Sequence, residues 1–139
     1  MNELALTDAL AERDLLDTAR SPGTYALRLS VSDSVETVAR TWMDTHPSAL
    51  PEGTEERLAA ASRVLYVGAS GNVYDRLCDH VRAKGERVRS ASFVAAFEVR
   101  EVVDVWPEDT AQDAFDAEYN RALSLADDDT RVWTDGTLL

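Results

Sequence analysis

Apolar residues alternate with other residues in two stretches of the chain, which predicts two half-buried β-strands. The first stretch covers residues 23–31, and the second covers residues 93–99, from which we expect the strand to bend on through residue 105. A third strand is expected at residues 64–67, an apolar run of strand length that the loop sequence Gly68-Ala-Ser-Gly71 closes. The pattern therefore predicts three strands.

Apolar residues at helical spacing predict helices around these strands. Thr7 can cap a helix over residues 7–18, which Ser21-Pro22-Gly23 ends. Asn72 can cap another over residues 72–84. Further helices are expected at residues 34–45, 54–61 and 109–126. In the helix expected at residues 34–45, the apolar stripe is made by Val35, Val38, Ala39, Trp42 and Met43. In the helix expected at residues 72–84, Val73, Leu77 and Val81 are expected to face inward. The mixture of strands and helices predicts an α+β fold.

Length and composition limit the class of protein. A chain of 139 residues predicts one domain, residues 1–139. No apolar run approaches the roughly 20 residues of a membrane-spanning helix, so we expect no membrane partner. Residues 1–20 include Glu3, Asp8, Glu12 and Asp14, whereas a secretion signal would have a basic start and an apolar middle. We therefore expect a cytoplasmic protein. The single Cys78 forms no internal disulfide and leaves no cysteine cluster for zinc.

The charge balance points to an unusual solvent. The formal net charge is -12, and the basic residues include a single lysine, Lys84, among otherwise only arginines. An acidic surface is tolerated in molar salt, where screening removes most of the mutual repulsion, and we expect a halophilic protein. Residues 61–100 depart from this balance, because basic residues outnumber acidic ones there. This basic region is either a footprint for an anionic partner or an ordinary solvated surface.

Glu118 is the most informative residue of the sequence, because it lies in the middle of the apolar stripe of the helix expected at residues 109–126. The stripe is made by Ala111, Ala114, Phe115, Ala122 and Leu125. Taking a carboxylate out of water costs several kcal/mol unless it is paired, protonated or bound to a cation. Glu118 is thus a candidate metal ligand, with a structural ion pair or a position at the helix rim as the alternatives.

Arg76 and His80 lie four residues apart in one expected helix, so that both side chains share a flank. Arginine offers a forked, permanently charged donor that suits phosphate, and histidine can exchange a proton near neutral pH. The ordinary alternative is a solvated pair on the helix surface. Tyr25 and Tyr66, in two of the expected strands, are either core residues or members of the same site. The loop at residues 68–72 could hold an anion on free backbone amides.

In this order the motifs resemble those of the GIY-YIG nuclease family. Gly23-Thr24-Tyr25 stands for the first triplet, and Tyr66-Val67-Gly68 stands for the second. The most specific block is YVGASGNVYDRLCDHV, residues 66–81, and the resemblance covers residues 23–125. It implies a small three-stranded antiparallel sheet flanked by helices, with a core at about 23–126. An N-terminal helix and a helical insertion at about 32–61, between the first two strands, are added to it.

The resemblance further implies a metal-dependent endonuclease that hydrolyses phosphodiester bonds, most simply in DNA. Tyr25 would help to activate the attacking water, and Tyr66 would hydrogen-bond in the phosphate pocket. Arg76 would offset charge on the phosphoryl oxygens, and His80 would relay a proton or orient Tyr25. Glu118 would bind one divalent metal, Mg²⁺ or Mn²⁺. The triplets read GTY and YVG, and no asparagine near the end of the chain matches the one that supports the metal in many members.

Nucleic-acid contacts are expected from basic residues at and beyond the end of the helix predicted at residues 72–84, namely Arg82, Lys84, Arg87 and Arg89. The helix expected at residues 34–45 could dock a protein partner or a second copy of the chain. Two alternatives to a nuclease stay open. One is a domain of the same fold that binds nucleic acid without cutting it, and the other is a protein-interaction module.

Overall fold

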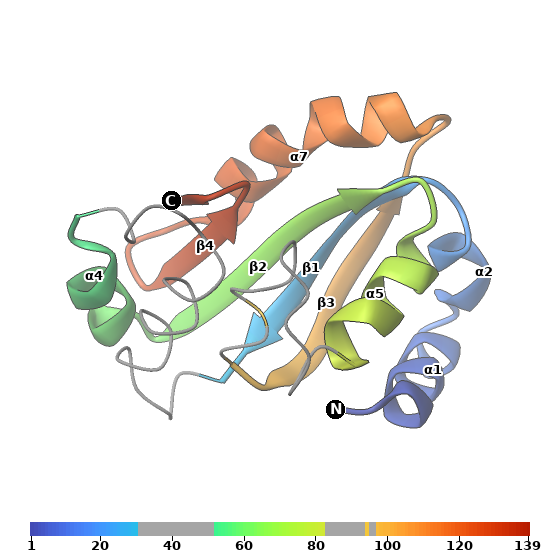
Figure 1. Ribbon diagram of the computed structural model, residues 1–139, viewed down its shortest axis with the longest axis horizontal. Helices are drawn as coiled ribbons and strands as arrows, with labels where there is room; N and C mark the ends of the chain where they lie inside the picture. The colour runs from blue at the N-terminus through green and yellow to red at the C-terminus, as the bar shows by residue number, and fades with distance from the viewer. Residues whose placement is uncertain (31–51, 83–93, 95–96) are drawn as a thin grey trace.

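The computed structural model describes residues 1–30, 52–82, 94 and 97–139 (Figure 1). Helices and strands alternate along the described chain. In chain order they are α1 (Glu3–Glu12), α2 (Leu16–Ala19), β1 (Gly23–Leu29), α4 (Thr54–Ala60), β2 (Arg63–Ser70), α5 (Val73–Arg82), β3 (Val99–Pro107), α7 (Ala111–Leu125), β4 (Thr130–Thr134) and β5 (Thr137–Leu138). The predicted α+β class is confirmed. The helix predicted at residues 34–45 lies outside the described residues, as does much of the predicted insertion.

The strands form one mixed sheet of five strands in the order β3-β1-β2-β4-β5. The three strands β3, β1 and β2 pair antiparallel, as the sequence predicts. The prediction of a three-stranded sheet was wrong, because β4 adds parallel to β2 and β5 adds antiparallel to β4. These two strands are short and rich in polar residues, so they lack the alternation that marks β1.

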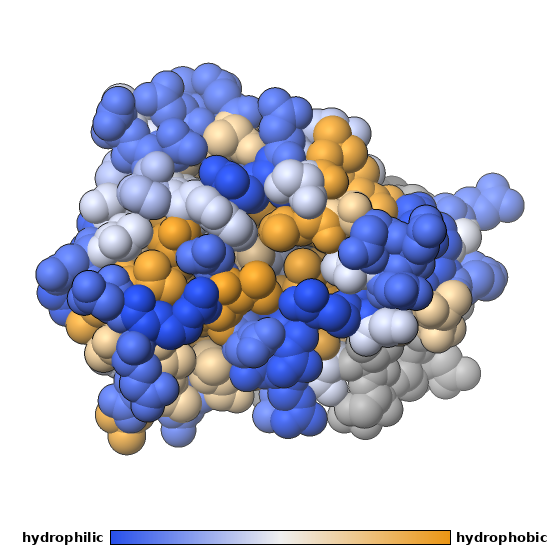
Figure 2. All heavy atoms as spheres, turned by 180° about the vertical axis from the view of Figure 1, so that it is seen from behind, coloured by the Kyte–Doolittle hydropathy of each residue, from blue (hydrophilic) through white to orange (hydrophobic). Residues whose placement is uncertain are grey.

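Helices cover both faces of the sheet. Side chains of β1 alternate between two apolar clusters, with Tyr25, Leu27 and Leu29 in the larger cluster and Ala26 in the smaller one. The larger cluster includes residues of α1 and α5, and the smaller one includes Ala122 of α7. Figure 1 accordingly shows α5 and α7 on either side of the sheet. Viewed from behind, the molecule gathers apolar residues near the centre of its surface, between hydrophilic ones (Figure 2).

The N-terminal helix differs from its prediction at both ends. Asn2, rather than Thr7, caps α1, since its side-chain oxygen accepts a hydrogen bond of 2.9 Å from the amide of Ala5. The helix ends at Glu12 because Asp14 adopts a left-handed conformation with φ of 56°. The apolar residues beyond this break belong to the separate short helix α2.

Two strand boundaries were also wrong. Strand β2 runs to Ser70, so most of the loop predicted at residues 68–72 is strand. Strand β3 begins at Val99, whereas the alternation predicted a strand from residue 93. The amide of Phe97 donates to the carbonyl of Val94 at 3.0 Å, a bond between residues close in sequence and not between strands. Both residues are buried, so their apolar character reflects the core rather than a strand.

The remaining predicted helices agree closely with α4, α5 and α7. Val73 and Leu77 are fully buried, as predicted. Phe115 is an exception in α7, because it was expected to face inward and is 54% exposed. In the described part of the chain, every helix is too short or too polar to span a bilayer.

Candidate functional site

The two tyrosines of the candidate site come from neighbouring strands and point to the same face of the sheet. In the antiparallel register of β1 and β2, Tyr25 lies opposite Gly68 and Leu27 lies opposite Tyr66. Tyr25 and Tyr66 are therefore diagonal neighbours, and their ring centroids are 6.3 Å apart. The second triplet thus supplies both a phenol and, in Gly68, the residue across from the first phenol.

Gly68 makes room for the hydroxyl group of Tyr25. A Cβ atom at position 68 would lie 2.3 Å from Tyr25 Oη, far inside van der Waals contact. Gly23, in the first triplet, has a similar role at the other edge of β1, where a Cβ atom would lie 2.4 Å from the carbonyl oxygen of Trp106. Both glycines are required by close approach rather than by a turn.

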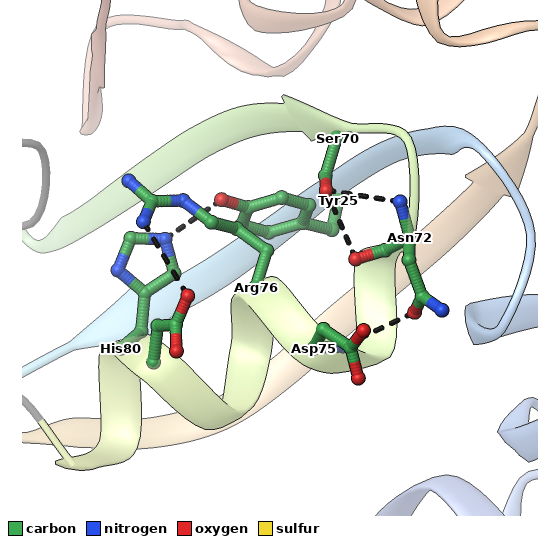
Figure 3. Close-up of polar contacts among 7 residues, drawn as sticks. Tyr25, Ser70, Asn72, Asp75, Arg76 and His80 are labelled. Carbon is green, nitrogen blue, oxygen red and sulfur yellow. Dashed lines mark hydrogen bonds and ion pairs between the residues drawn. The ribbon is translucent and has the colours of Figure 1, made fainter.

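Helix α5 carries Arg76 and His80 to the same hydroxyl group (Figure 3). His80 Nε2 lies 2.7 Å from Tyr25 Oη, and the His80 ring contacts Tyr66 edge-on at a centroid distance of 5.0 Å. Arg76 hydrogen-bonds to both phenols and also lies 3.8 Å from the carboxylate of Asp79. The shared flank that the sequence predicts for Arg76 and His80 therefore faces the tyrosines.

The start of α5 is fixed by a compact turn. Asn72 caps the helix, because its side-chain oxygen accepts from the amide of Asp75 at 3.2 Å, as predicted. The amide of Asn72 donates to Ser70 Oγ at 3.1 Å, and the amide of Val73 donates to the carbonyl of Ser21 at 3.3 Å. These two amides are occupied, so the amide of Asn72, the last residue of the loop predicted at residues 68–72, is not free to hold an anion.

Burial controls the protonation of the phenol and imidazole groups. Desolvation raises the pKa of Tyr25 well above its ordinary value, and the nearby Tyr66 adds to the effect. Desolvation also raises the pKa of Tyr66, against the positive charge of Arg76. For His80, burial and then Arg76 lower the pKa to about 3. All three side chains are therefore neutral at pH 7.

Glu118 approaches the site from α7, on the other side of the sheet. The carboxylate accepts a hydrogen bond from the backbone amide of Ala69, near the end of β2. The pairing of β2 with β4 stops at Tyr66 and Trp133, so this part of β2 is not covered by β4. Partial burial, with the negative charge of Asp135 as the second cause, raises the pKa of Glu118 to about 7. Glu118 also acts electrostatically on both tyrosines.

Asp135 is a member of this group that the sequence did not indicate as functional. It lies in the turn between β4 and β5, with φ of 43°. The sequence predicts a turn at Asp135-Gly136, and this is confirmed, but the turn alone does not show which other element it meets. The signal in the sequence is the position of Asp135 near the end of the chain, where the family resemblance implies a residue that supports the metal and no asparagine stands.

The five predicted site residues thus form one electrostatically coupled group, drawn from β1, β2, α5 and α7. Arg82 forms an ion pair with Glu3 of α1, and Lys84, Arg87 and Arg89 lie outside the described residues. Within the described ranges, histidine, cysteine, aspartate and glutamate side chains form no metal-binding cluster of three or more.

Fold and site define a small α+β domain in which two strand tyrosines lie against a helical arginine and histidine, and a carboxylate from a later helix bonds to the backbone of β2 within electrostatic range of the tyrosines. Models of known protein families, curated proteins and solved structures give no match to this chain.

Proposed function

We propose that this chain is a metal-dependent endonuclease of the GIY-YIG type that hydrolyses phosphodiester bonds in DNA. The observation that carries the proposal is the association of Tyr25, Tyr66, Arg76, His80 and Glu118 in one group, although they are spread over residues 25–118. Hydrolysis of a phosphodiester needs positive charge on the nonbridging oxygens, a positioned water and a path for its proton. Each of these requirements has a candidate residue in the group.

Arg76 is the group suited to the phosphate. Its side chain is 20% exposed, and its guanidinium lies beside both phenols. A guanidinium keeps its charge at any relevant pH and donates in a planar fork, which matches two phosphoryl oxygens. In this proposal Arg76 binds the scissile phosphate and stabilises the charge that develops on it in the transition state.

The proton of the attacking water is assigned to the phenols. Tyr25 is completely buried, whereas Tyr66 is half-buried. Tyr66 is therefore the phenol that meets the water, and Tyr25 acts behind it, through its hydrogen bonds to Tyr66 and His80. This assignment changes the role expected for Tyr25, because a side chain with no exposed surface does not meet a water molecule that enters the site from bulk solvent together with the substrate.

The carboxylates fit a divalent cation. The negative charge of Asp135 raises the electrostatic cost of ionising Glu118, and a bound cation would offset that cost. Mg²⁺ is commonly held by one or two carboxylates, with water and substrate phosphate as its remaining ligands. Glu118, with Asp135 beside it, would hold Mg²⁺ or Mn²⁺, which would supply Lewis-acid stabilisation of the phosphoryl group.

The assignments of habitat and partner belong to the same proposal. A net charge of -12 suits a halophilic, cytoplasmic protein. In molar salt, long-range attraction to phosphate is weak, so DNA must be held by close contacts in the site. We assign the basic residues after α5 to the flanking backbone phosphates.

A plasmid-nicking assay in molar KCl with Mg²⁺ tests the proposal. The wild-type chain should nick the plasmid, and Glu118→Gln should lower the rate about 100-fold or more, as removal of one charge-stabilising group typically does. Asp116→Asn is the matched control, because Asp116 lies exposed on the same helix, where its carboxylate accepts a hydrogen bond from Gln112. It should keep the wild-type rate.

A nicking rate that is the same for wild type and Glu118→Gln would contradict the proposal. A gel-shift at the same salt concentration then separates the alternatives. Retained binding of DNA would indicate a binding domain without cleavage, and loss of binding would favour a protein-interaction module.

A further inference from the structure

One buried nitrogen in the site has no role in the proposed function. His80 is 2% exposed, and its Nε2 contacts Tyr25. Its other ring nitrogen, Nδ1, is buried without a hydrogen-bond partner among the described residues. Figure 3 shows the His80 ring with one nitrogen toward Tyr25 and the other turned away from it. A buried polar group without a hydrogen bond costs about 1–3 kcal/mol of stability, so we expect Nδ1 to have a partner, such as an ordered water molecule.

The hydrogen bonds around Tyr25 indicate which nitrogen of His80 carries the proton. Arg76 can only donate, so the oxygen of Tyr25 accepts from it. The Tyr25 proton is then available for His80 Nε2. The separation of 2.7 Å agrees with a hydroxyl donor, because bonds donated by N–H groups are typically near 2.9 Å. A neutral His80 that accepts at Nε2 must carry its proton at Nδ1.

A small cavity lies beside His80. Its volume is about 10 Å³, which accommodates one water molecule, and His80 lines it. The other lining residues are Met1, Val81, Val94, Phe97, Glu98 and Val99. Among these side chains, only that of Glu98 is charged, and it is 39% exposed. The cavity therefore lies between the buried imidazole and a carboxylate that reaches solvent.

We infer that this cavity is a binding site for a single water molecule, which accepts a hydrogen bond from His80 Nδ1 and donates to the carboxylate of Glu98. Water, Glu98 and His80 together form an outlet for the proton that leaves the phenols, on the side of His80 away from Tyr25. The outlet function rests on the proposed nuclease activity, whereas the water site does not.

The protons balance along this route. As the attacking water gives a proton to Tyr66 Oη, Tyr66 gives its own to Tyr25 Oη, and Tyr25 gives its own to His80 Nε2. The Nδ1 proton passes to the bound water, which passes one to Glu98. Burial and Arg76 disfavour a cationic His80, which drives this release. Return of a proton from Glu98 by the same route restores the first tautomer and leaves Tyr66 able to protonate the departing oxygen.

Glu98 is a positioning residue in this route, and its carboxylate also forms ion pairs with two charged neighbours. The N-terminal ammonium lies 3.8 Å from one of its oxygens, and Arg100 lies 3.7 Å from the other. Both contacts are with exposed or partly exposed groups, which contribute little to stability. Glu98→Gln therefore removes the proton acceptor without unfolding the chain.

Nitrogen-15 NMR tests the tautomer and the water directly. The chain has two histidines, so a His46→Gln variant assigns the remaining imidazole signals to His80. We expect a protonated Nδ1, an unprotonated Nε2 and a cross-peak between the Nδ1 proton and water that does not depend on nuclease activity. The opposite tautomer, or a protonated Nδ1 without the cross-peak, would overturn the water site.

A cavity-filling substitution gives a second arm. Val99→Ile adds a methyl group to the cavity wall and should remove the water cross-peak. Val105→Ile is the matched control, because Val105 is buried in the same strand and the same apolar cluster but does not line the cavity. It should leave the cross-peak intact. Equal cross-peaks in both variants would contradict the placement of the water.

Kinetics test the outlet. Glu98→Gln should lower kcat about fivefold at unchanged KM and increase the solvent isotope effect, because proton exit becomes slower. Glu101→Gln, three residues further along the chain in β3 and ion-paired with Arg28, should change neither. Unchanged kcat in Glu98→Gln would overturn the outlet. Inactivity of the wild-type chain would overturn both the outlet and the proposed function, while the NMR results would still decide the water site.

Discussion

The two halves of the candidate site differ in how far they are removed from water. In the half between β1 and α5, Tyr25 and His80 are 0% and 2% exposed. In the half formed by α7 and the β4–β5 turn, Glu118 is only half-buried. Burial favours the neutral form in both halves, so it raises the pKa of the phenol and of the carboxyl and lowers that of the imidazole.

The outcome at neutral pH is nevertheless different. The buried phenols and His80 stay neutral over a wide pH range, which suits the passage of a proton through hydrogen bonds. Glu118 has a pKa of about 7, so a cation can readily shift it to its ionised form. Depth of burial thus separates a half whose side chains stay neutral from a half whose carboxyl group ionises near neutral pH. The substitutions below test this division.

Gly68→Ala should have the largest effect, because it acts on the packing of the buried half. The added Cβ atom would overlap the hydroxyl group of Tyr25, which is held by His80 and cannot move freely. We expect a loss of about 3 kcal/mol in the free energy of unfolding, measured with urea at constant salt. Nicking activity should be lost as well.

Gly71→Ala is the control for this substitution. The nearest atom to a Cβ atom at position 71 is Cβ of Ala111 at 3.4 Å, an ordinary contact. Its effect should stay within about 0.5 kcal/mol. Equal stability of the two variants would show that Tyr25 is not confined as described.

Tyr25→Phe should have the next largest effect, because it leaves His80 Nε2 buried without a donor. We expect a loss of about 2 kcal/mol in unfolding free energy, since an unsatisfied buried group retains its full desolvation cost. Tyr74→Phe is the comparison. It removes a partly buried hydrogen bond to Thr7 at 2.9 Å and should cost about 1 kcal/mol or less. A larger loss for Tyr74→Phe would contradict the central place given to the Tyr25–His80 bond.

The buried half was the easier one to predict from the sequence. Alternation in β1 and the helical spacing of Arg76 and His80 depend on local geometry, so they indicate which faces these residues share. The face of β1 and the Asn72 cap were accordingly correct. The resemblance of residues 66–81 to a family motif then predicted that the strand tyrosines and the helix with Arg76 and His80 belong to one site.

The charged half depends on contacts that no local pattern encodes. Glu118 was identified because a carboxylate interrupts an apolar stripe. Its neighbour Asp135 could not be identified in the same way, because the pairing of β4 with β2 brings it close to Glu118. The parallel pairing of β4 is a tertiary contact of a short, polar strand. The break at Asp14 and the start of β3 at Val99 were also not predicted, because in both places the apolar pattern continues past the residue at which the element ends or begins.

Glu118→Gln tests the charged half through stability. The pKa of Glu118 in the folded chain is raised to about 7 from an ordinary 4.5, so the folded form binds the proton more tightly than the unfolded form does. Its carboxylate therefore lowers stability progressively as the pH rises from about 4.5 to about 7, and the full cost remains above pH 7. Without metal, Glu118→Gln should unfold like wild type at low pH and be about 1 kcal/mol more stable at pH 8, where solvent screening limits the gain.

Addition of Mg²⁺ at pH 8 should reduce this difference, because a cation that binds only the folded wild type stabilises it. Urea unfolding of both variants with and without Mg²⁺ makes the comparison. A wild-type chain that is more stable than Glu118→Gln at pH 8 without metal would show that Glu118 has a compensating partner. In that case the carboxylate would be structural, as one reading of the sequence allows.

Asp135→Asn should have the smallest effect on stability and the most specific one on charge. Asparagine tolerates the left-handed backbone that Asp135 adopts, so the substitution removes the charge without adding strain. The pKa of Glu118 should then fall from about 7 toward its ordinary value, because the repulsion from Asp135 is lost. Desolvation, the larger cause, should keep it above 4.5. Carbon-13 NMR titration of the Glu118 carboxyl measures the shift, with Asp128→Asn, an exposed residue outside the site, as the control. An unchanged Glu118 titration in Asp135→Asn would separate the two carboxylates and leave Glu118 as the single charged ligand of the half-buried side.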